Sequence, residues 1–536
     1  MPGMRPALVL AVAGCMLLFA GLSLWEMSGD SLTSDERVHL PAGYVYWKTG
    51  DFRLNPEHPP LMKLFCAAPL LALGLHLPPT TPEAGQTFHD YQPTFGSRFL
   101  FSQDFERILF WGRLPAVAVG LVLLGFLFAW SREMHGSAIA GLLTLALASL
   151  EPTLLAHSHL VADDVALATF GIMAYYFLWR FGRGGALRDL LLATLGLGLA
   201  LASKFSAIFQ LPLFLILAWV AWPRGGLVVR GRARPEIVAA SRPVVLAGMV
   251  LVMIVIVQAA YLFSTDPMLY LKGIQEVRAN RPAINPVYVH GAFYDPAPFW
   301  YPLYAFLLKT PLPTLAAQLG GILLAVRSRG RTRGALAFLI LPAALHVAMV
   351  CGLAYNYGQR YLLPMTAFLL VPAGGVAALL SASRARRAAG ALCAVWLLVS
   401  VLHAAPNQIA YFNELIGGPA NGPYFLSDSN LDWGQDLKRL ARYQREKALP
   451  EISLAYWGPG QPEYYGIRWH GWAAADVMTD RPPAGVYAIS VNRLVELKRR
   501  VVLSGDSPNL DWLERFRPTA RVGGSILIYD FRESPR

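Results

Sequence analysis

Long apolar runs are the feature that most limits what this chain can fold into. Runs of roughly 17 to 25 apolar residues, enough to cross a bilayer as a helix, recur along residues 1 to 405. A composition of 55% hydrophobic and 15% charged residues, with a mean hydropathy of +0.41, is too apolar for an ordinary soluble enzyme. We therefore expect an all-α polytopic membrane protein of about eleven spans, at residues 5–25, 108–130, 138–156, 164–181, 188–203, 205–222, 243–263, 311–326, 335–353, 361–380 and 388–405.

Basic residues predict the orientation of these spans, because Lys and Arg are retained on the cytoplasmic side. Alternate connections are short and basic: "RFGRGGALR", "PRGGLVVRGRARPEIVAASR", "RSRGRTR" and "SRARR". The intervening segments lack this excess, and residues 26–107 hold six Lys and Arg against ten Asp and Glu. The N-terminus is thus expected inside and everything after about residue 405 outside. The formal charge of +12 is mostly a topology signal, and its dispersal over several loops argues against a nucleic-acid partner.

Two long outward loops and a polar tail complete the expected organisation. The loops are residues 26–107 and 264–310, within a transmembrane domain of residues 1–405. In the first loop "PLMKLFCAAPLLALGLHL" is apolar but too short for a comfortable span, so we expect an interfacial or re-entrant helix. Residues 406–536 are polar, and "ISLAYW", "GVYAISV" and "SILIYDF" look like short strands. A small extracytoplasmic α/β domain is the simplest interpretation of this tail.

Ionisable residues gather at the outer ends of the predicted spans. They are Asp35, Glu36, Arg113, Asp163, Asp164, Lys204, Lys309 and Arg360. Each has an ordinary explanation, because loop-start carboxylates cap helices and basic residues at span ends extend toward water. His58 before two prolines could likewise serve only to shape its loop. Their joint position at one membrane face favours a functional site, since ionisable groups at membrane depth are costly.

Several motifs resemble a known family. "SDERVHL" with "PEHPPLMK" resembles the first extracytoplasmic loop of the protein O-mannosyltransferases and their bacterial relatives that use polyprenyl-phosphate sugars. "WGRLPAVAVG", "DVALATF", "LASKFSA" and "YGQRYLLP" resemble later elements of that family, in the expected order. "YFNELIGGPANG" and "DSNLDWGQDLKRL" resemble the tail of a bacterial branch of phospholipid-carrier-dependent glycosyltransferases.

The resemblance implies a C-type glycosyltransferase fold and activity. A hexosyl or pentosyl group would pass from a polyprenyl-phosphate-linked donor to a hydroxyl of a lipid, glycan or protein acceptor, outside the cytoplasm and with inversion. The tail differs from that of the eukaryotic mannosyltransferases, so the resemblance does not assign a protein acceptor. The expected location is a bacterial inner membrane, with membrane lipids around the spans and a role in the cell envelope.

Roles follow for the matching residues. Asp35 is the expected general base, and Glu36 beside it would favour a raised pKa. Arg113, Lys204 and Arg360 are candidates to bind the donor phosphate, which leaves as a stable anion and needs cations. The expected substrate-positioning residues are His58, Lys63, Asp164, Lys309 and Tyr361. Asp164 could instead ligate a divalent cation, for which its hard oxygens suit Mg or Mn.

A transporter or flippase of a lipid-linked or anionic substrate is the main alternative, because many spans with intramembrane charges describe those proteins too. A non-catalytic assembly scaffold is the third interpretation. The one-sided clustering of ionisable residues, the long first loop and the lack of obviously paired halves argue for glycosyl transfer. No compact Asp-x-Asp motif or Gly-rich phosphate loop points to a soluble nucleotide donor.

Overall fold

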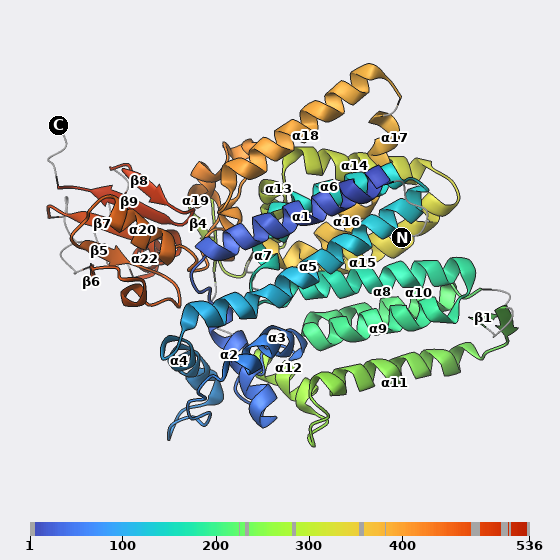
Figure 1. The fold of residues 1–536 in the computed structure, drawn as a ribbon, viewed down its shortest axis with the longest axis horizontal. Helices are drawn as coiled ribbons and strands as arrows, with labels where there is room; N and C mark the ends of the chain where they lie inside the picture. Colours follow the sequence, from blue (N-terminus) through green and yellow to red (C-terminus); the bar gives the residue numbers. More distant parts are fainter. Residues whose placement is uncertain are drawn as a thin grey trace.

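Long helices form most of the molecule, and a small sheet lies at one end of them (Figure 1). The computed structural model describes residues 6–223, 226–230, 235–280, 286–352, 358–380, 382–472, 483–504, 513 and 516–532. In these residues seven helices are long and apolar enough to cross a membrane. They are α1 (Pro6–Gly29), α5 (Phe105–His135), α8 (Asp164–Gly184), α11 (Arg242–Ala260), α15 (Arg331–Cys351), the stretch Gln359–Leu380 and α18 (Arg384–Ala404). The stretch Gln359–Leu380 contains η3 (Gln359–Leu362), α16 (Leu363–Ala373), η4 (Gly374–Val376) and α17 (Ala377–Leu380).

Two bent helix pairs raise the number of spans to nine if each pair counts as one span. α6 (Ala138–Ser149) and α7 (Pro152–Ser158) meet at 64°, and α13 (Tyr301–Lys309) and α14 (Leu312–Arg327) meet at 113°. Each second helix follows a proline break, because proline fits the first helical turn but cannot continue a preceding helix. The predicted spans 188–203 and 205–222 correspond to shorter apolar helices, α9 (Leu187–Ser203) and η2 (Phe205–Phe209) with α10 (Gln210–Val220). The count of eleven therefore stays a prediction.

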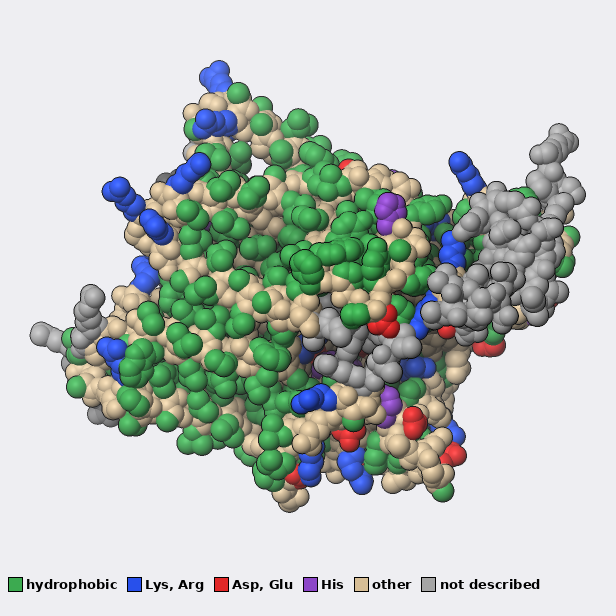
Figure 2. All heavy atoms as spheres, turned by 180° about the vertical axis from the view of Figure 1, so that it is seen from behind, with side chains coloured by type: hydrophobic (Ala, Val, Ile, Leu, Met, Phe, Trp, Pro, Cys, Tyr) green, Lys and Arg blue, Asp and Glu red, His purple; other side chains and the backbone are tan. Residues whose placement is uncertain are grey.

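Exposed hydrophobic side chains cover the helical part of the molecule. Leu251 and Ile254 on α11, and Val395 and Val399 on α18, are each about half exposed or more. Figure 2 shows a broad hydrophobic surface between basic residues at one edge and a mixture of acidic, basic and histidine side chains toward the other end. So many exposed hydrophobic side chains on one broad surface favour contact with membrane lipid over contact with water. The chain is an integral membrane protein.

The two loops that are predicted to face outward contain their own short elements. The first holds α2 (Glu36–Thr49), α3 (Leu61–Ala67), η1 (Ala68–Leu73) and α4 (Phe88–Phe101). The second holds α12 (Leu269–Ala279) and a two-stranded sheet of β3 (Val287–Val289) and β4 (Ala292–Tyr294). Residues 61–73 form a short apolar helical segment, as predicted, and their position in the membrane interface stays a prediction.

The tail contains a five-stranded mixed sheet with the order β6-β5-β7-β9-β8. Its strands are β5 (Ile452–Ala455), β6 (Trp469–Gly471), β7 (Val486–Ser490), β8 (Ala520–Val522) and β9 (Ile526–Asp530). β5 runs parallel to β6 and β7, whereas β9 runs antiparallel to β7 and β8, with Ala488 opposite Ile528. The three predicted strand segments coincide with β5, β7 and β9. The domain boundary at residue 406 stays a prediction.

Short helices connect the bundle to this sheet and pack on it. They are η5 (Gln408–Ala410), η6 (Glu414–Ile416), η7 (Pro419–Asn421), α19 (Gly422–Phe425), η8 (Asp428–Asn430), α20 (Leu437–Glu446), η9 (Pro462–Tyr465) and α22 (Val491–Ser504). At the opposite end of the bundle β1 (Leu227–Arg230) and β2 (Pro235–Val238) form an antiparallel pair (Figure 1).

Candidate active site

The two adjacent carboxylates at the start of α2 point in different directions. Asp35 occupies the N-cap position, but it caps no backbone N–H and instead accepts a hydrogen bond of 2.7 Å from Arg360 Nη1. Its side chain is 28% exposed. Glu36 is fully buried, and its Oε2 accepts bonds of 3.1 and 2.9 Å from the backbone N–H and the hydroxyl of Thr33. Only Asp35 of this pair is accessible to a substrate.

Glu36 forms a buried ion pair with Arg113 on α5. Arg113 Nε and Nη2 donate to the two carboxylate oxygens at 2.8 and 2.7 Å. Its remaining N–H groups donate to the backbone oxygens of Met27, Asp30 and Ser31 at 2.9 to 3.2 Å. All five guanidinium donors are therefore used inside the protein. Arg113 therefore has the geometry of a structural clamp on the first loop, and its predicted contact with the donor phosphate stays a prediction.

Four other predicted residues form a connected group with Asp35 where the helices end. Arg360, in η3, lies 3.8 Å from Asp164 Oδ2 as well as beside Asp35. Lys204 ends α9 in an extended conformation, and its Nζ donates to Asp164 Oδ1. The Tyr361 ring centroid lies 4.9 Å from Lys204 Nζ and 5.4 Å from Arg360 Cζ. We call Asp35, Asp164, Lys204, Arg360 and Tyr361 the Asp35 cluster.

His58 lies next to Asp163, an ionisable residue for which the sequence suggested no separate role. His58 Nε2 is 4.0 Å from Asp163 Oδ2, and its ring meets the ring of His39 edge to face, with centroids 5.9 Å apart. Asp163 is buried, yet neither of its carboxylate oxygens has a hydrogen-bond partner within the described part of the chain. Such a group needs an explanation, and a substrate contact is a candidate.

The two remaining predicted lysines donate hydrogen bonds to backbone carbonyl oxygens. Lys63 Nζ donates to the carbonyl oxygens of Asn55 and His58 at 2.7 and 3.0 Å, so it shapes the loop that carries His58. Lys309 Nζ is buried and donates to the carbonyl oxygens of Ile409, Tyr411 and Asn430. An ammonium has three donors, so Lys309 has none left for a substrate. In this structure Lys309 anchors the start of the tail, and its predicted role in positioning a substrate stays a prediction.

Charges around Asp35 keep it ionised. Burial acts to raise the pKa of Asp35, but the guanidinium of Arg360, together with His39 and Lys204, outweighs burial and holds the pKa below its ordinary value. Glu36 was expected to raise the pKa of Asp35. Arg113, however, pairs with the Glu36 carboxylate and neutralises its charge. Burial also lowers the pKa of His58 well below its ordinary range, so this imidazole is neutral at pH 7. For Asp163, burial raises the pKa.

The surroundings of Asp164 do not fit the divalent cation that the sequence suggested. One of its oxygens accepts from Lys204 and the other faces Arg360, so cations already occupy the positions where a metal would bind. Among the residues that the structure describes, no group of three or more His, Cys, Asp or Glu side chains is suited to hold a metal ion. A metal role for Asp164 is therefore not part of our interpretation.

Comparison with known proteins gives a family match over part of the chain. Residues 40–272 match the model of the family described as dolichyl-phosphate-mannose-protein mannosyltransferase. The predicted family resemblance is confirmed for this segment. This matched stretch, residues 40–272, is called the family segment below. It includes His58, Asp163, Asp164 and Lys204, whereas Asp35 precedes it and Arg360 follows it. A search of curated proteins gave no match.

Several solved structures are similar to this chain at low sequence identity. The apo structure of ArnT from Cupriavidus metallidurans has 14% sequence identity and a TM-score of 0.49, with 97% of each chain covered. The oligosaccharyltransferase AglB from Archaeoglobus fulgidus, in complex with an inhibitory peptide and a dolichol-phosphate, has 10% identity and a TM-score of 0.46, covering 96% of this chain and 72% of that one. The S. cerevisiae protein O-mannosyltransferase Pmt1-Pmt2 complex has 15% identity and a TM-score of 0.30, covering 52% of this chain and 34% of that one.

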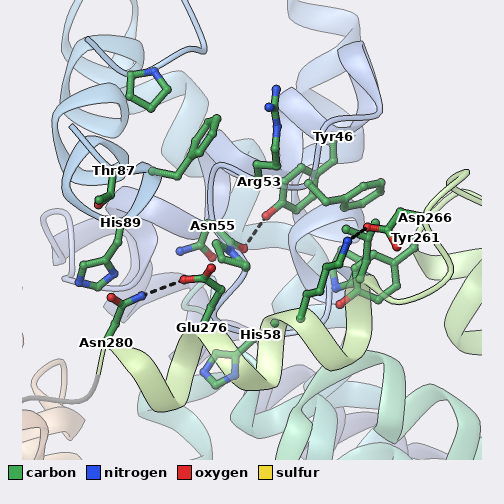
Figure 3. A pocket seen from close by; sticks show the side chains of 18 of the residues that line it. Tyr46, Arg53, Asn55, His58, Thr87, His89, Tyr261, Asp266, Glu276 and Asn280 are labelled. Atoms are coloured by element: carbon green, nitrogen blue, oxygen red, sulfur yellow. Dashed lines mark hydrogen bonds and ion pairs between the residues drawn. The ribbon is translucent and has the colours of Figure 1, made fainter. Parts of the chain in front are cut away.

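A cavity opens beside His58, between the first loop of the family segment and α12. Its volume is about 730 Å³, within the range of small-molecule sites. Aromatic and polar side chains both line it, among them Tyr46, Phe52, Asn55, His58, Tyr261 and Glu276 (Figure 3). His58 belongs to this wall and also lies beside Asp163, so it connects the cavity wall to the carboxylate next to Asp164.

Sequence reasoning missed two contributions to the site. Asp163 was noted only as an ionisable residue at a span end, although its position next to Asp164 was the available signal. Trp433 was quoted within the tail motif "DSNLDWGQDLKRL" without a role. Its ring centroid lies 4.4 Å from Arg360 Cζ, so the tail reaches the Asp35 cluster.

Proposed function

We propose that this protein is a membrane glycosyltransferase that moves a sugar from a polyprenyl-phosphate-linked donor to a hydroxyl acceptor. The observation that carries the proposal is the Asp35 cluster, which joins one accessible carboxylate to two cations at the end of a membrane bundle. The match of residues 40–272 to a family of sugar-phosphate-using mannosyltransferases supports it. Transfer of a hexosyl or pentosyl group fits this chemistry, and the acceptor hydroxyl could belong to a lipid, a glycan or a protein.

Asp35 is the general base of the proposed reaction. The acceptor oxygen attacks the anomeric carbon, the bond from this carbon to the phosphate oxygen breaks, and the hydroxyl proton passes to the Asp35 carboxylate. Because the pKa of Asp35 lies below its ordinary value, proton transfer follows after most of the new carbon–oxygen bond has formed. A single displacement of this kind inverts the anomeric centre.

Arg360 and Lys204 stabilise the leaving phosphate. The electron pair of the broken bond goes to a phosphate that gains negative charge, and cations held in place respond to that charge without reorganisation. Asp164 orders both cations from one side, since Lys204 donates to one of its oxygens and Arg360 faces the other. His58, in the wall of the cavity, and Asp163 beside it would orient the substrate hydroxyls.

The proposed reaction takes place on the extracytoplasmic side of a bacterial inner membrane. The sheet of the tail lies at the end of the bundle near α2 and α4, whereas β1 and β2, in one of the basic connections, lie at the other end (Figure 1). The excess of Lys and Arg assigns the β1–β2 end to the cytoplasm. Residues 1–405 would then form the transmembrane domain, with loops 26–107 and 264–310 outside, and residues 406–536 an extracytoplasmic α/β domain. The N-terminus would be cytoplasmic.

Donor turnover tests this function directly. The purified full chain is incubated with a panel of polyprenyl-phosphate sugars and a mixed set of hydroxyl acceptors, and release of the carrier phosphate is measured. We expect release with at least one donor and loss of release in Asp35→Asn at the same protein concentration. Transport of a labelled donor across vesicles with no carrier release would instead favour a flippase.

A further inference from the structure

A short segment of the tail, residues 431–437, packs directly on the start of the first loop. The backbone N–H of Ser31 donates to the Gln435 carbonyl at 2.9 Å, and the Ser31 hydroxyl donates to the Gly434 carbonyl at 2.9 Å. The N–H of Ser34 donates to the Trp433 carbonyl at 3.3 Å. The residue preceding the proposed base is therefore hydrogen-bonded to the tail.

Trp433 projects from this segment against Arg360. The indole is 2% exposed, and its ring centroid lies 4.4 Å from the guanidinium carbon. Tyr361 lies near the same guanidinium, at 5.4 Å from ring centroid to Cζ. A guanidinium held against an aromatic face keeps its N–H groups directed outward in its own plane. Here one of those groups meets Asp35 at 2.7 Å.

The segment is itself fixed from two sides. Arg439 Nη1 donates to carboxylate oxygens of Asp30 and Asp436 at 2.7 Å each, which ties α20 to the end of α1. On the other side Asp432 Oδ2 accepts from the backbone N–H of Asn492 at 3.0 Å. Between these anchors the Trp433 ring has little freedom to move. The His157 ring closes its edge, with centroids 5.5 Å apart.

We propose that Trp433 is a positioning residue of this site, whose indole face holds Arg360 in the orientation that binds the donor phosphate. The inference rests on the proposed function, in which Arg360 stabilises that phosphate. It adds a requirement outside the family segment, because a residue of the tail becomes necessary for donor binding. Without the aromatic face, the guanidinium would still carry its charge. It would no longer be held in the orientation in which it faces Asp35 and Asp164.

Two substitutions separate the aromatic face from simple filling of space. Trp433→Phe keeps an aromatic face, and Trp433→Leu fills part of the same volume without one. Binding of undecaprenyl phosphate to the purified full chain is measured for both, together with the KM for the donor that the wild type uses. We expect Trp433→Leu to weaken binding about 10-fold and Trp433→Phe to stay within about 3-fold of wild type, as the loss of a desolvated cation–π contact predicts. Trp469→Leu, in β6 of the same tail, is the matched control and should bind like the wild type.

The outcomes separate this inference from the proposed function. Equal binding by Trp433→Phe and Trp433→Leu, with both variants melting like the wild type, would overturn the positioning role while leaving the glycosyltransferase in place. Failure of the wild type to bind undecaprenyl phosphate or any of the sugar donors would overturn the proposed function and this inference together. If Trp433→Leu does not fold, Trp433→Met replaces it, because the flexible Met side chain fills irregular space without an aromatic face.

Discussion

At the scale of single residues, the neighbouring carboxylates Asp35 and Glu36 have different roles, one open to a substrate and the other buried in the fold. Glu36 is enclosed by Thr33 and Arg113, so its charge is used entirely within the fold. Asp35 has Arg360 on one side and remains partly open. A carboxylate that is paired but still reachable can accept a proton, whereas a fully enclosed one cannot without breaking its partners' bonds.

Removing the charge of Asp35 should abolish most turnover. Asp35→Asn keeps the shape but removes the proton acceptor, so we expect the kcat for sugar transfer to fall roughly 100-fold or more with donor binding retained. Initial rates at saturating donor and matched protein concentration measure this. Asp51→Asn, on the same loop and paired only with exposed Arg53, is the control and should be active. Near-normal transfer by Asp35→Asn would remove Asp35 as the base and direct attention to Asp163.

The pH dependence of activity should report the ion pair of Asp35 with Arg360. A lowered pKa keeps the base ionised to lower pH, so the acidic limb of kcat/KM that reports Asp35 should lie near or below the ordinary Asp value of about 3.9. In Arg360→Gln the effect of burial is no longer opposed by the guanidinium, and the acidic limb of the profile should move to higher pH. Profiles measured for both proteins with the same donor test this. An unmoved limb would show that Asp35 is not the titrating base.

Arg113 should matter for stability rather than for the donor. Arg113→Lys leaves at most three donors for a site that uses five, so buried acceptors lose partners and the free energy of unfolding should fall by about 3 kcal/mol. Unfolding of the detergent-solubilised protein measures the change, and Arg107→Lys, exposed on the same helix, is the control. A raised donor KM with unchanged stability would restore the phosphate-binding role predicted from the sequence.

At the scale of elements, the first loop and the tail form one unit although about 400 residues separate them. Arg439 contributes an ion pair to this contact, because it donates to Asp30 of the first loop as well as to Asp436 and the Pro406 carbonyl within the tail. Arg439→Gln should loosen the contact, so the backbone amides of Ser31 and Ser34 should exchange hydrogen with solvent markedly faster than in the wild type. Exchange measured by mass spectrometry, with the exposed Arg442→Gln as the control, tests this. Unchanged exchange at both serines would show that packing alone holds the tail in place.

The elements of the bundle could be predicted well, because apolar length is a local property of the sequence. The predicted span 108–130 lies within α5, and 164–181 lies within α8. The bend at Pro152 was not predicted, since the predicted span 138–156 runs through this proline. The predicted span 311–326 begins at Pro311, and the helix before it, α13, was predicted as part of the loop 264–310. Strands β5, β7 and β9 were visible from their β-branched and aromatic runs, whereas β6 and β8, with three residues each, are too short to give a pattern.

The site was predictable in its residues but less so in their roles. The family motifs pointed to Asp35, Asp164, Lys204 and Arg360, which the fold brings together. Which carboxylate each cation meets depends on packing between residues 40 to 325 positions apart in the sequence, and no local pattern records it. Arg113 and Lys309 illustrate the consequence, because a basic residue at a span end looks the same in sequence whether it faces a phosphate or a backbone carbonyl.

At the scale of the whole molecule, the site, the cavity and the tail should all lie on one side of the membrane. The sheet of the tail and the β1–β2 pair are at opposite ends of the bundle (Figure 1), so a reporter inserted after Ala240 and one fused at the C-terminus should report opposite compartments. The excess of basic residues near β1 and β2 predicts that the first is cytoplasmic and the second extracytoplasmic. A third reporter at Gly330, in another basic connection, should agree with the first. Activity of all three on one side would invalidate the orientation, and with it the proposal that the sugar acceptor approaches Asp35 from outside the cell.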